Sequence, residues 1–291
     1  LSRRGAPRGQ LLRLPLATPV LDRAKVIVPE SKTVLSDFRP AATRVFVISL
    51  AGGPSELKVF GLDGKPLGDV STPPVSSVFG LVNPEVDDLY FRIESYTEPP
   101  AWFHLAPGAA APVRTALVTK SPVDLSDVVV KRETATSKDG TRVPFTILSK
   151  KGAALDGDNP TLLYAYGGYG LSETPGFSPA LAVWLERGGV YAVANLRGGG
   201  EFGEEWHLAG NLVRKQNVFD DFLACGRRLV ELKYTRPARL AILGGSNGGL
   251  LMGAALTQAP ELYRAVVSFV GIYDMLRVET QPNGAFNVTE F

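Results

Sequence analysis

The sequence predicts a parallel α/β domain preceded by an all-β segment, and three observations predict this fold class. Short apolar runs separated by turn residues fill the first 125 residues, which is typical of a sandwich, barrel or propeller. From residue 126 on, apolar runs of strand length alternate with helix-length segments, which indicates a parallel sheet. The length of 291 residues and the 45% apolar content suffice for two globular domains. We therefore expect domains at residues 1–125 and 126–291.

Composition and charge exclude several classes of protein. The formal net charge is +2, so the charge balance favours neither a nucleic-acid nor a membrane-surface partner. No window approaches the roughly 18 consecutive apolar residues of a membrane-spanning helix. Cys225 is the only cysteine, which excludes an internal disulfide framework and a multi-cysteine metal site. We expect no nucleic-acid partner, no membrane partner and no metal site.

The first 125 residues contain a regular succession of expected strands. They lie at 44–50, 56–62, 76–82, 88–93, 101–105 and 112–118. Asp63-Gly64, between two of them, is a dipeptide that favours a tight hairpin. Four strands in roughly 40–50 residues make one blade of a β-propeller, and two or three blades fit this segment. A β-sandwich fits the spacing nearly as well, so both architectures stay open at this point.

The second segment begins with an expected hairpin at 127–150 that turns at Asp139-Gly140, and its rhythm then changes. Expected strands follow at 161–168, 190–198, 239–245 and 265–271, and expected helices at 179–189, 217–233 and 247–258. The longest of these helices is amphipathic. Its apolar positions are Val218, Phe222, Leu223, Leu229, Val230 and Leu232. Strand and helix alternate here as they do in a parallel α/β sheet.

Residues 244–248, Gly-Gly-Ser-Asn-Gly, match the pattern G-x-S-x-G between an expected strand and an expected helix. This context is that of a nucleophile elbow, in which a strained turn holds a serine hydroxyl above the sheet edge. Glycines on both sides let neighbouring segments approach without Cβ clashes, and the helix N-terminus favours a developing anion. We predict that Ser246 is a catalytic nucleophile. The alternative is an ordinary glycine-rich helix start, since the pattern also occurs by chance.

A rival motif lies at 198–203, where Gly-Gly-Gly-Glu-Phe-Gly satisfies G-x-G-x-x-G after an expected strand. With Asp220 and Asp221 about 20 residues further on, it resembles a dinucleotide fingerprint. The residues that follow, Glu-Glu-Trp-His, are not a small apolar helix start, and their two carboxylates would repel a pyrophosphate. We therefore disfavour dinucleotide binding and expect no organic cofactor.

A third glycine turn, Ala-Tyr-Gly-Gly-Tyr-Gly at 165–170, follows an early strand of the expected sheet. In α/β hydrolases a turn at this place supplies part of the oxyanion hole. The phenol of Tyr166 could donate a hydrogen bond to an oxyanion. A core tyrosine at a strand end is an equally good interpretation of its spacing.

No histidine follows Ser246, although a serine hydrolase of this fold carries its acid and base after the nucleophile in chain order. The sequence has two histidines: His104, which we expect to pack in the β segment, and His207, which we expect to form a local hydrogen bond. Asp274 follows the last expected strand and comes one strand too early to be the acid. The chain also starts without a methionine. We expect a fragment, truncated at both ends, whose acid and base lie beyond Phe291.

Several long motifs occur in one order: YAYGGYG, ANLRGGGEFGEEWH, KQNVFDDF, GGSNGGLLMGA and GIYDMLR. Together they resemble prolyl oligopeptidase, the S9 family of serine peptidases, over residues 126 to about 280. The resemblance implies an α/β hydrolase domain joined to a β-propeller that admits only short peptides. It implies that the hydrolase domain at 126–291 is incomplete at its C-terminus, and that residues 1–125 are the last blades of the propeller.

The resemblance also implies catalytic roles, residue by residue. Ser246 matches the family nucleophile. Asn247 matches the residue whose backbone N–H helps to form the oxyanion hole. Tyr166 matches the tyrosine whose hydroxyl completes that hole, which favours the functional interpretation of this residue over a packing role.

Three further positions match the family's substrate pocket. Tyr169 and Ile272 match positions that line the proline pocket. Phe286 lies near the position of the pocket tryptophan, in a stretch, PNGAFNVTEF, that departs from the family pattern. Because of this departure, proline preference is less firmly indicated than serine chemistry.

The implied function is that of a serine endopeptidase that hydrolyses short peptides on the carboxyl side of proline through an acyl-enzyme on Ser246. A related S9 peptidase or esterase of another specificity is the first alternative, and a non-catalytic propeller or hydrolase-like binding protein is the second. We expect no cofactor, a monomer in the complete protein and a cytoplasmic location, with the periplasm as the alternative. The 291 residues on their own should have little or no peptidase activity, because the triad acid and base are missing.

Overall fold

The computed structural model describes residues 1–282 and 284–291, and their contacts divide the chain into two compact units. The first unit comprises Leu1–Pro122 with Thr174–Ser178, and the second comprises Val123–Glu173 with Pro179–Phe291. The division after Pro122 lies three residues before the expected one at residue 125. Nothing in the sequence predicts that the segment from Thr174 to Ser178 joins the first unit. It does so partly through the Ser77 hydroxyl, which donates to the Pro175 carbonyl (2.6 Å).

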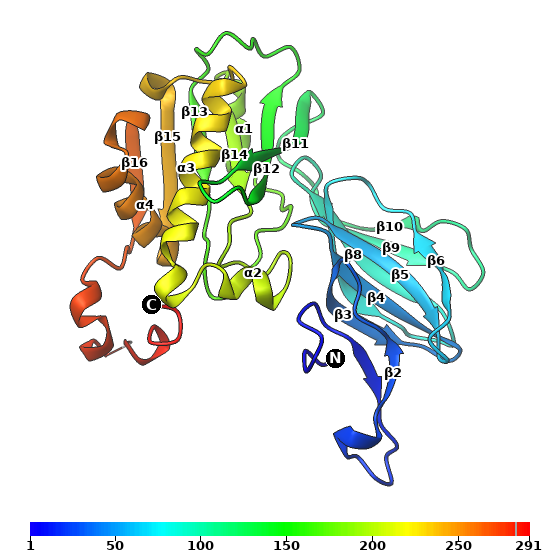
Figure 1. Ribbon diagram of the computed structural model, residues 1–291. Coiled ribbons are helices and arrows are strands. Elements are labelled where there is room, and N and C mark those ends of the chain that lie inside the picture. The colour runs from blue at the N-terminus through cyan, green and yellow to red at the C-terminus, as the bar shows by residue number, and fades with distance from the viewer. Residues whose placement is uncertain (283) are drawn as a thin grey trace. The chain divides into compact units, whose positions relative to one another are not determined.

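Two four-stranded antiparallel sheets and a two-stranded ribbon form the first unit (Figure 1). The sheet orders are β3-β4-β5-β6 and β10-β9-β8-β7, so each sheet consists of consecutive strands. The elements are β1 (Leu11–Arg13), η1 (Leu21–Arg23), β2 (Lys25–Val28), β3 (Val34–Pro40), β4 (Arg44–Leu50), β5 (Ser55–Gly61), β6 (Pro66–Val70), β7 (Ser76–Val82), β8 (Leu89–Ser95), β9 (Ala101–Leu105) and β10 (Val113–Val118).

One apolar core joins the two sheets of the first unit. It contains Phe46 and Leu57 of the first sheet and Leu89 and Phe91 of the second, all almost completely buried. Each sheet is completed before the chain enters the next one. In a Greek-key sandwich, by contrast, strands alternate between the sheets. The connectivity therefore favours two propeller blades over a sandwich.

The sequence analysis missed the ribbon strands β1 and β2 and the edge strands of the first sheet, β3 and β6. Four of the five residues of β6 are exposed, so no alternation of apolar residues marks it. The exposed positions of β3 include Ser36 and Asp37, which interrupt its apolar pattern. An edge strand needs to bury fewer side chains than a central one, and its sequence signal is correspondingly weak.

A six-stranded sheet forms the centre of the second unit, with the order β11-β12-β14-β13-β15-β16 (Figure 1). The strands from β14 to β16 are parallel, which confirms the expected parallel sheet, while β11 and β12 add an antiparallel hairpin at one edge. The strands are β11 (Val128–Thr136), β12 (Arg142–Lys150), β13 (Thr161–Tyr164), β14 (Val190–Ala194), β15 (Leu240–Gly245) and β16 (Ala265–Phe269).

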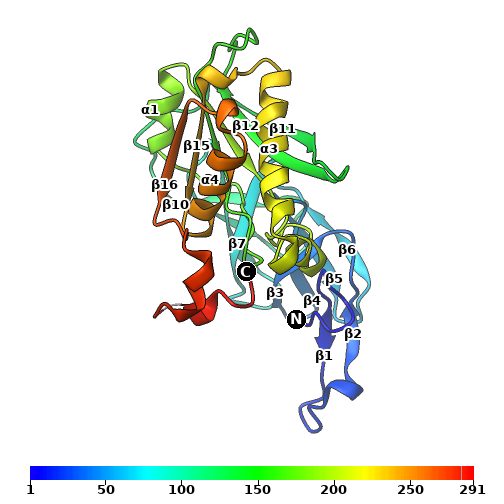
Figure 2. The same ribbon diagram turned by 60° about the vertical axis from the view of Figure 1, so that its left-hand side comes forward.

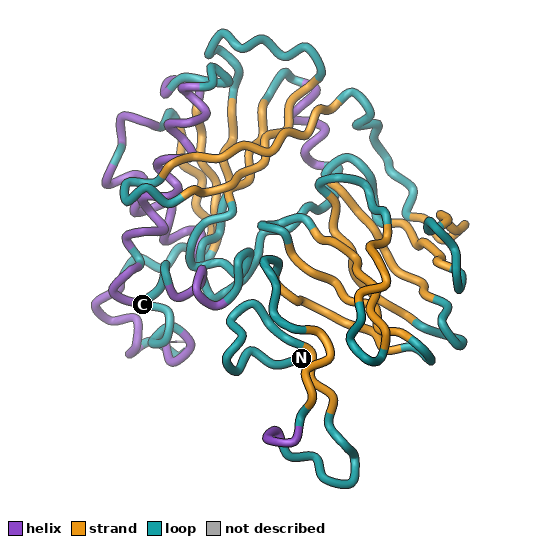
Figure 3. Tube along the Cα trace, turned by 45° about the vertical axis from the view of Figure 1, so that its right-hand side comes forward, coloured by secondary structure: helices purple, strands orange, loops and turns teal. Residues whose placement is uncertain are grey.

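Helices flank both faces of this sheet, with α3 and α4 on one face and α1 on the other (Figure 2; helices are purple in Figure 3). The helices are α1 (Ala180–Glu186), α2 (Glu204–Leu208), α3 (Gln216–Glu231) and α4 (Asn247–Gln258), and short 3-10 turns lie at η2 (Leu212–Arg214), η3 (Pro237–Arg239), η4 (Pro260–Leu262), η5 (Met275–Thr280) and η6 (Gly284–Phe286). None of the helices in the described part of the chain combines the length and the apolar character of a membrane span.

The apolar stripe of α3 seals one face of the sheet. Val218, Phe222, Cys225 and Leu229 are fully buried, at the spacing of four, three and four residues that keeps side chains on one face of a helix. Val230, which was also expected in the stripe, is only partly buried because it lies a third of a turn away from Leu229.

Phe222→Ala should lower the free energy of unfolding by roughly 3–5 kcal/mol, because it leaves a cavity where a fully buried ring packs. The thiol of Cys225, on the same stripe, can be used to measure this loss of stability. In the folded protein, burial raises the pKa of the thiol and keeps it from reagents. Labelling of Cys225 by a disulfide reagent, followed by mass spectrometry of the full-length protein, should become faster in the variant. Leu256→Ala, at an exposed position of α4, should leave the rate unchanged. Equal rates for Phe222→Ala and wild type would contradict this packing.

Candidate active site

Ser246 occupies a strained turn between β15 and α4. Its φ of 57° and ψ of −117° lie outside the regions that side-chain-bearing residues ordinarily adopt. Its N–H donates to the Phe269 carbonyl on β16 (2.9 Å), and the residue is exposed. The glycines of the motif are required by packing: a Cβ on Gly244 would collide with the Gly248 carbonyl, and one on Gly248 would lie 2.9 Å from the Ala165 carbonyl. The geometry is that of a nucleophile elbow.

Tyr166 lies on the turn that follows β13 and is brought to Ser246 by the parallel pairing of β13 with β15. Partial burial raises the pKa of the Tyr166 phenol, and the neighbouring Ser246 side chain opposes this shift. The phenol therefore keeps its proton at neutral pH and is available as a donor beside the serine. Its role as an oxyanion donor, rather than as a tyrosine that only packs, stays a prediction.

Asn247 is the first residue of α4, so its backbone N–H is among those that have no acceptor within the helix. Its side chain is buried and donates from Nδ2 to the Tyr166 carbonyl (2.6 Å). The elbow and the Tyr166 turn are thus bonded to each other directly. The turn carries the phenol of Tyr166 and the elbow carries the backbone N–H of Asn247, so one potential donor lies on each side of this bond. Their roles in an oxyanion hole stay predictions.

A hollow of about 620 Å³ adjoins the serine and brings three of the predicted site residues together: Ser246, Ile272 and Phe286. Phe286 is 78% exposed, so its ring is available to a ligand. The other lining residues are Gly271, Tyr273, Asp274, Val278, Gln281 and Asn287. Asp274 is not a free charge in this hollow, because it forms an ion pair with Arg277 (2.8 Å).

Tyr169 is not among the residues that line the hollow at Ser246. Its ring packs edge-on against Phe291, with centroids 5.9 Å apart, and its hydroxyl donates to the Asn287 side chain. Asn287 in turn lines the hollow. Asn287 and Phe291 are therefore candidate site residues that the sequence analysis missed, because both come from a distant stretch without a motif.

Both histidines are bonded to carboxylates. His104 bonds to Asp88 (2.9 Å) and stacks on Tyr90, as a packed histidine would. His207 was expected to form a local hydrogen bond, but its hydrogen bond is to a distant residue. Its Nε2 atom bonds to Glu290 (2.9 Å), 83 residues away, while the local Glu204 lies at 3.5 Å. A distant carboxylate of this kind has no signal in the sequence around the histidine.

The glycines of the rival motif at 198–203 pack against the Tyr166 turn. A Cβ on Gly198 would lie 2.7 Å from the Gly167 carbonyl, and one on Gly200 would collide with the Gly170 carbonyl. Asp221, the candidate ribose ligand, is fully buried and binds the Arg197 guanidinium through both oxygens (2.6 and 2.9 Å). The motif thus serves loop packing, and the dinucleotide alternative is not supported.

Glu201 is the buried carboxyl group of this loop. Burial raises its pKa from 4.5 to about 7. Its Oε1 atom accepts from the Glu173 backbone N–H (2.8 Å) and from Asn195 Nδ2 (3.2 Å). Among the described residues, Oε2 has no hydrogen-bond partner. The group holds the chain after the Tyr166 turn against the loop that follows β14.

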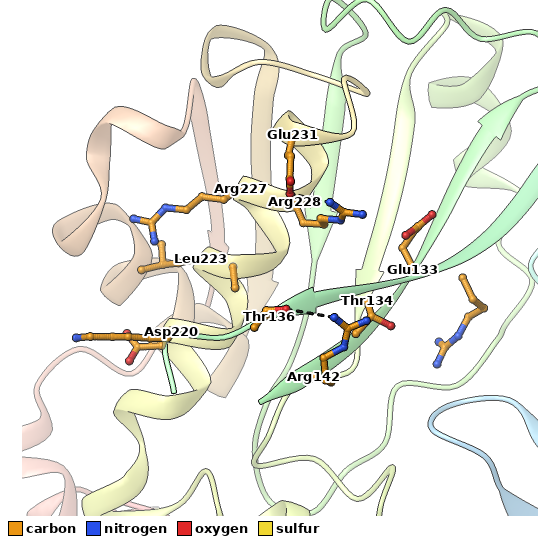
Figure 4. A pocket seen from close by; sticks show the side chains of 12 residues that line it. Glu133, Thr134, Thr136, Arg142, Asp220, Leu223, Arg227, Arg228 and Glu231 are labelled. Atoms are coloured by element: carbon orange, nitrogen blue, oxygen red, sulfur yellow. Dashed lines mark hydrogen bonds and ion pairs between the residues drawn. The ribbon is translucent and has the colours of Figure 1, made fainter. Parts of the chain in front are cut away.

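A second hollow, of about 690 Å³, lies between the β11–β12 hairpin and α3 and contains none of the predicted site residues (Figure 4). Charged side chains of both signs line it. Among them, Arg142 donates to Thr136 (3.3 Å) and Arg228 pairs with Glu231 (2.7 Å). Across residues 1–282 and 284–291, no cluster of three or more His, Cys, Asp or Glu side chains is placed to hold a metal ion.

Protein-family models match parts of both units. The family model for prolyl oligopeptidase matches residues 175–291, and the model for the N-terminal β-propeller domain of prolyl oligopeptidase matches residues 1–112. The chain belongs to the prolyl oligopeptidase family. This membership confirms the propeller over the sandwich for the first unit and the hydrolase domain for the second.

Relatives in the family match almost the whole chain. It is 35% identical over 283 residues to a prolyl endopeptidase of Elizabethkingia meningoseptica, which covers 96% of this chain and 40% of that protein. A solved prolyl endopeptidase structure matches with a TM-score of 0.93 and 42% identity, over 99% of this chain and 43% of that one. A post-proline cleaving enzyme from Rickettsia typhi matches with a TM-score of 0.84 and 32% identity, over 97% and 42%. The chain thus spans about two fifths of the length of these prolyl oligopeptidase relatives.

Glu201→Gln should increase the stability of the protein relative to wild type as the pH rises. Between pH 4.5 and about 7 the native carboxyl holds a proton that the unfolded chain has released, so wild-type stability falls over this range. The gain at pH 8 should be on the order of 3 kcal/mol. Urea midpoints at pH 5 and pH 8 measure it, with Glu261→Gln, at an exposed position, as the control without a trend. A constant difference between Glu201→Gln and wild type would contradict the shifted pKa.

Proposed function

We propose that the full-length protein is a serine peptidase that hydrolyses short peptides on the carboxyl side of proline. The observation that carries the proposal is Ser246 on a strained elbow that is bonded, through Asn247, to the turn that carries Tyr166. Membership in the prolyl oligopeptidase family supports the same chemistry. A non-catalytic protein would have no need to retain a strained serine, since such a backbone conformation costs stability.

Acyl transfer at this site would proceed in two steps. Ser246 Oγ attacks the carbonyl carbon of the scissile bond while a general base takes its proton. The carbonyl oxygen becomes an oxyanion that the Tyr166 hydroxyl and the Asn247 N–H stabilise. Collapse of this intermediate releases the amine, which receives the proton from the base. Water then hydrolyses the acyl-enzyme by the same route.

We place the general base and its acid in a part of the full-length protein outside these 291 residues. Among the described residues, neither histidine forms a hydrogen bond with Ser246: His104 bonds to Asp88 and His207 to Glu290. Neither the position of Asp274 nor its ion pair with Arg277 fits the role of the acid. We therefore propose that a histidine from another part of the full-length protein lies next to Ser246 and acts as its general base.

Proline specificity is supported by the chemistry of the hollow next to Ser246. Ile272 and Phe286 offer apolar surface to a small ring. A pocket for a basic residue would need an uncompensated carboxylate. The nearby carboxylates are compensated: Asp274 by Arg277, and Glu290 by Lys215 (2.9 Å). The proline pocket is therefore favoured over a basic one.

The relatives support peptides as the substrate class. One solved relative, prolyl oligopeptidase B of Galerina marginata, is described as bound to a 25mer macrocyclization substrate, with a TM-score of 0.89 and 28% identity. We propose a peptide substrate of comparable kind here, cleaved without a cofactor by a monomer.

Tyr166→Phe in the full-length protein should lower kcat about 10²–10³-fold, because one oxyanion donor is lost while the ring still packs. Ser246→Ala should abolish acyl-enzyme formation. Tyr164→Phe is the matched control: its phenol bonds to Glu173 (3.1 Å), two residues before Tyr166. Release of the chromophore from a Gly-Pro-anilide substrate measures all three variants. An unchanged rate in Tyr166→Phe would remove this residue from the site, and an active Ser246→Ala would overturn the proposed nucleophile.

A further inference from the structure

Lys215 joins three segments of the chain at one point. Its Nζ atom donates to the Gly167 carbonyl (3.2 Å), to Asn247 Oδ1 (2.9 Å) and to Glu290 Oε1 (2.9 Å). It also lies over the Phe291 ring, 4.9 Å from the centroid. An ammonium group has three N–H donors. All three are used here, each on a different segment.

Two of the three segments carry the proposed oxyanion donors. Gly167 directly follows Tyr166, and Asn247 both provides the backbone donor and bonds to the Tyr166 carbonyl (2.6 Å). The turn is pressed onto the elbow so closely that a Cβ on Gly168 would lie 2.6 Å from Asn247 Nδ2. Lys215 and Asn247 therefore form a bonded bridge across the two sides of the oxyanion hole.

The charge of Lys215 is compensated at the same place. Its side chain is 11% exposed and that of Glu290 is 2% exposed. Burial lowers the pKa of Lys215, and the bond to Glu290 opposes that shift. The second oxygen of Glu290 is held by His207 (2.9 Å). A buried ammonium is tolerated when its charge is paired and its donors are satisfied, and both conditions are met here.

We propose that Lys215 is a positioning residue that sets the distance between the Tyr166 hydroxyl and the Asn247 N–H. The inference rests on the proposed function of this site. Lys215 does not reach the reacting atoms itself. It ties the Gly167 carbonyl and the Asn247 side chain to one nitrogen, so that the two donors converge on a single oxyanion. Without it the turn loses one bonded link to the elbow and keeps the bond from Asn247 to the Tyr166 carbonyl (2.6 Å).

Lys215→Met in the full-length protein should lower kcat on a Gly-Pro-anilide about 10²-fold with little change in KM, because displacement of a donor by about 1 Å has that effect on the transition state. The affinity for a peptidyl-prolinal aldehyde, whose hemiacetal oxygen would lie in the oxyanion hole, should fall by a similar factor. Lys150→Met is the matched control. It removes an exposed lysine paired with Asp127 (2.8 Å) in the same unit and should leave kcat unchanged.

Lys215→Arg tests the proposal even if the methionine variant fails to fold, because it keeps the charge beside Glu290. A planar guanidinium cannot place its donors on three oxygens around one point, so kcat should still fall. Wild-type turnover in Lys215→Arg would show that only the charge matters and would overturn the positioning role. Wild-type turnover in Lys215→Met would overturn it as well.

A double variant separates this inference from the function on which it rests. If Lys215 acts through the oxyanion donors, adding Tyr166→Phe to Lys215→Met should slow turnover little beyond the slower single variant. Full additivity of the two effects would overturn the inference and leave the proposed function intact. If Tyr166→Phe alone has wild-type turnover, the proposed oxyanion hole itself is wrong, and the positioning role falls with it.

Discussion

Three turns meet at the carboxyl edge of the parallel sheet so closely that side chains do not fit between their backbones. The turn after β13 contacts the loop after β14 at Gly198, where a Cβ would lie 2.7 Å from the Gly167 carbonyl. It contacts the elbow after β15 at Gly248, where a Cβ would lie 2.9 Å from the Ala165 carbonyl. The rest of the site depends on this contact, because it places Tyr166 and Ser246 side by side.

Buried charged side chains bond to these turns and fix their positions. Arg197, in the loop after β14, is bonded to Asp221 on α3 and to Asp139 in the hairpin turn, and the Arg197 guanidinium holds the pKa of Asp139 well below its usual range. Lys215, at the start of α3, donates hydrogen bonds to the turn after β13 and to the elbow. Such groups are costly to bury and rigid once paired, which suits a site whose donors have to be held in place before the substrate arrives.

The elbow could be predicted from the sequence because its signal is local. A strand, a G-x-S-x-G turn and a helix follow one another within 19 residues, from Leu240 to Gln258. The same holds for the longest helix and for the inner strands of the first unit. The signal was weaker where burial is one-sided: the edge strands β3 and β6 carry too few apolar residues to be seen.

What the sequence by itself determined was the fold class of the second unit, the serine elbow and the family. The residues after the G-x-G-x-x-G motif already disfavoured a pyrophosphate, but only the tertiary structure showed that its glycines serve close backbone contacts. It also decided the partners of His207 and Lys215, which meet at Glu290 from 83 and 75 residues away. Contacts of this range depend on which loops the sheet brings to one edge. A local sequence pattern cannot predict which loops meet, because the strand order places β13 between β14 and β15 and so departs from the order of the chain.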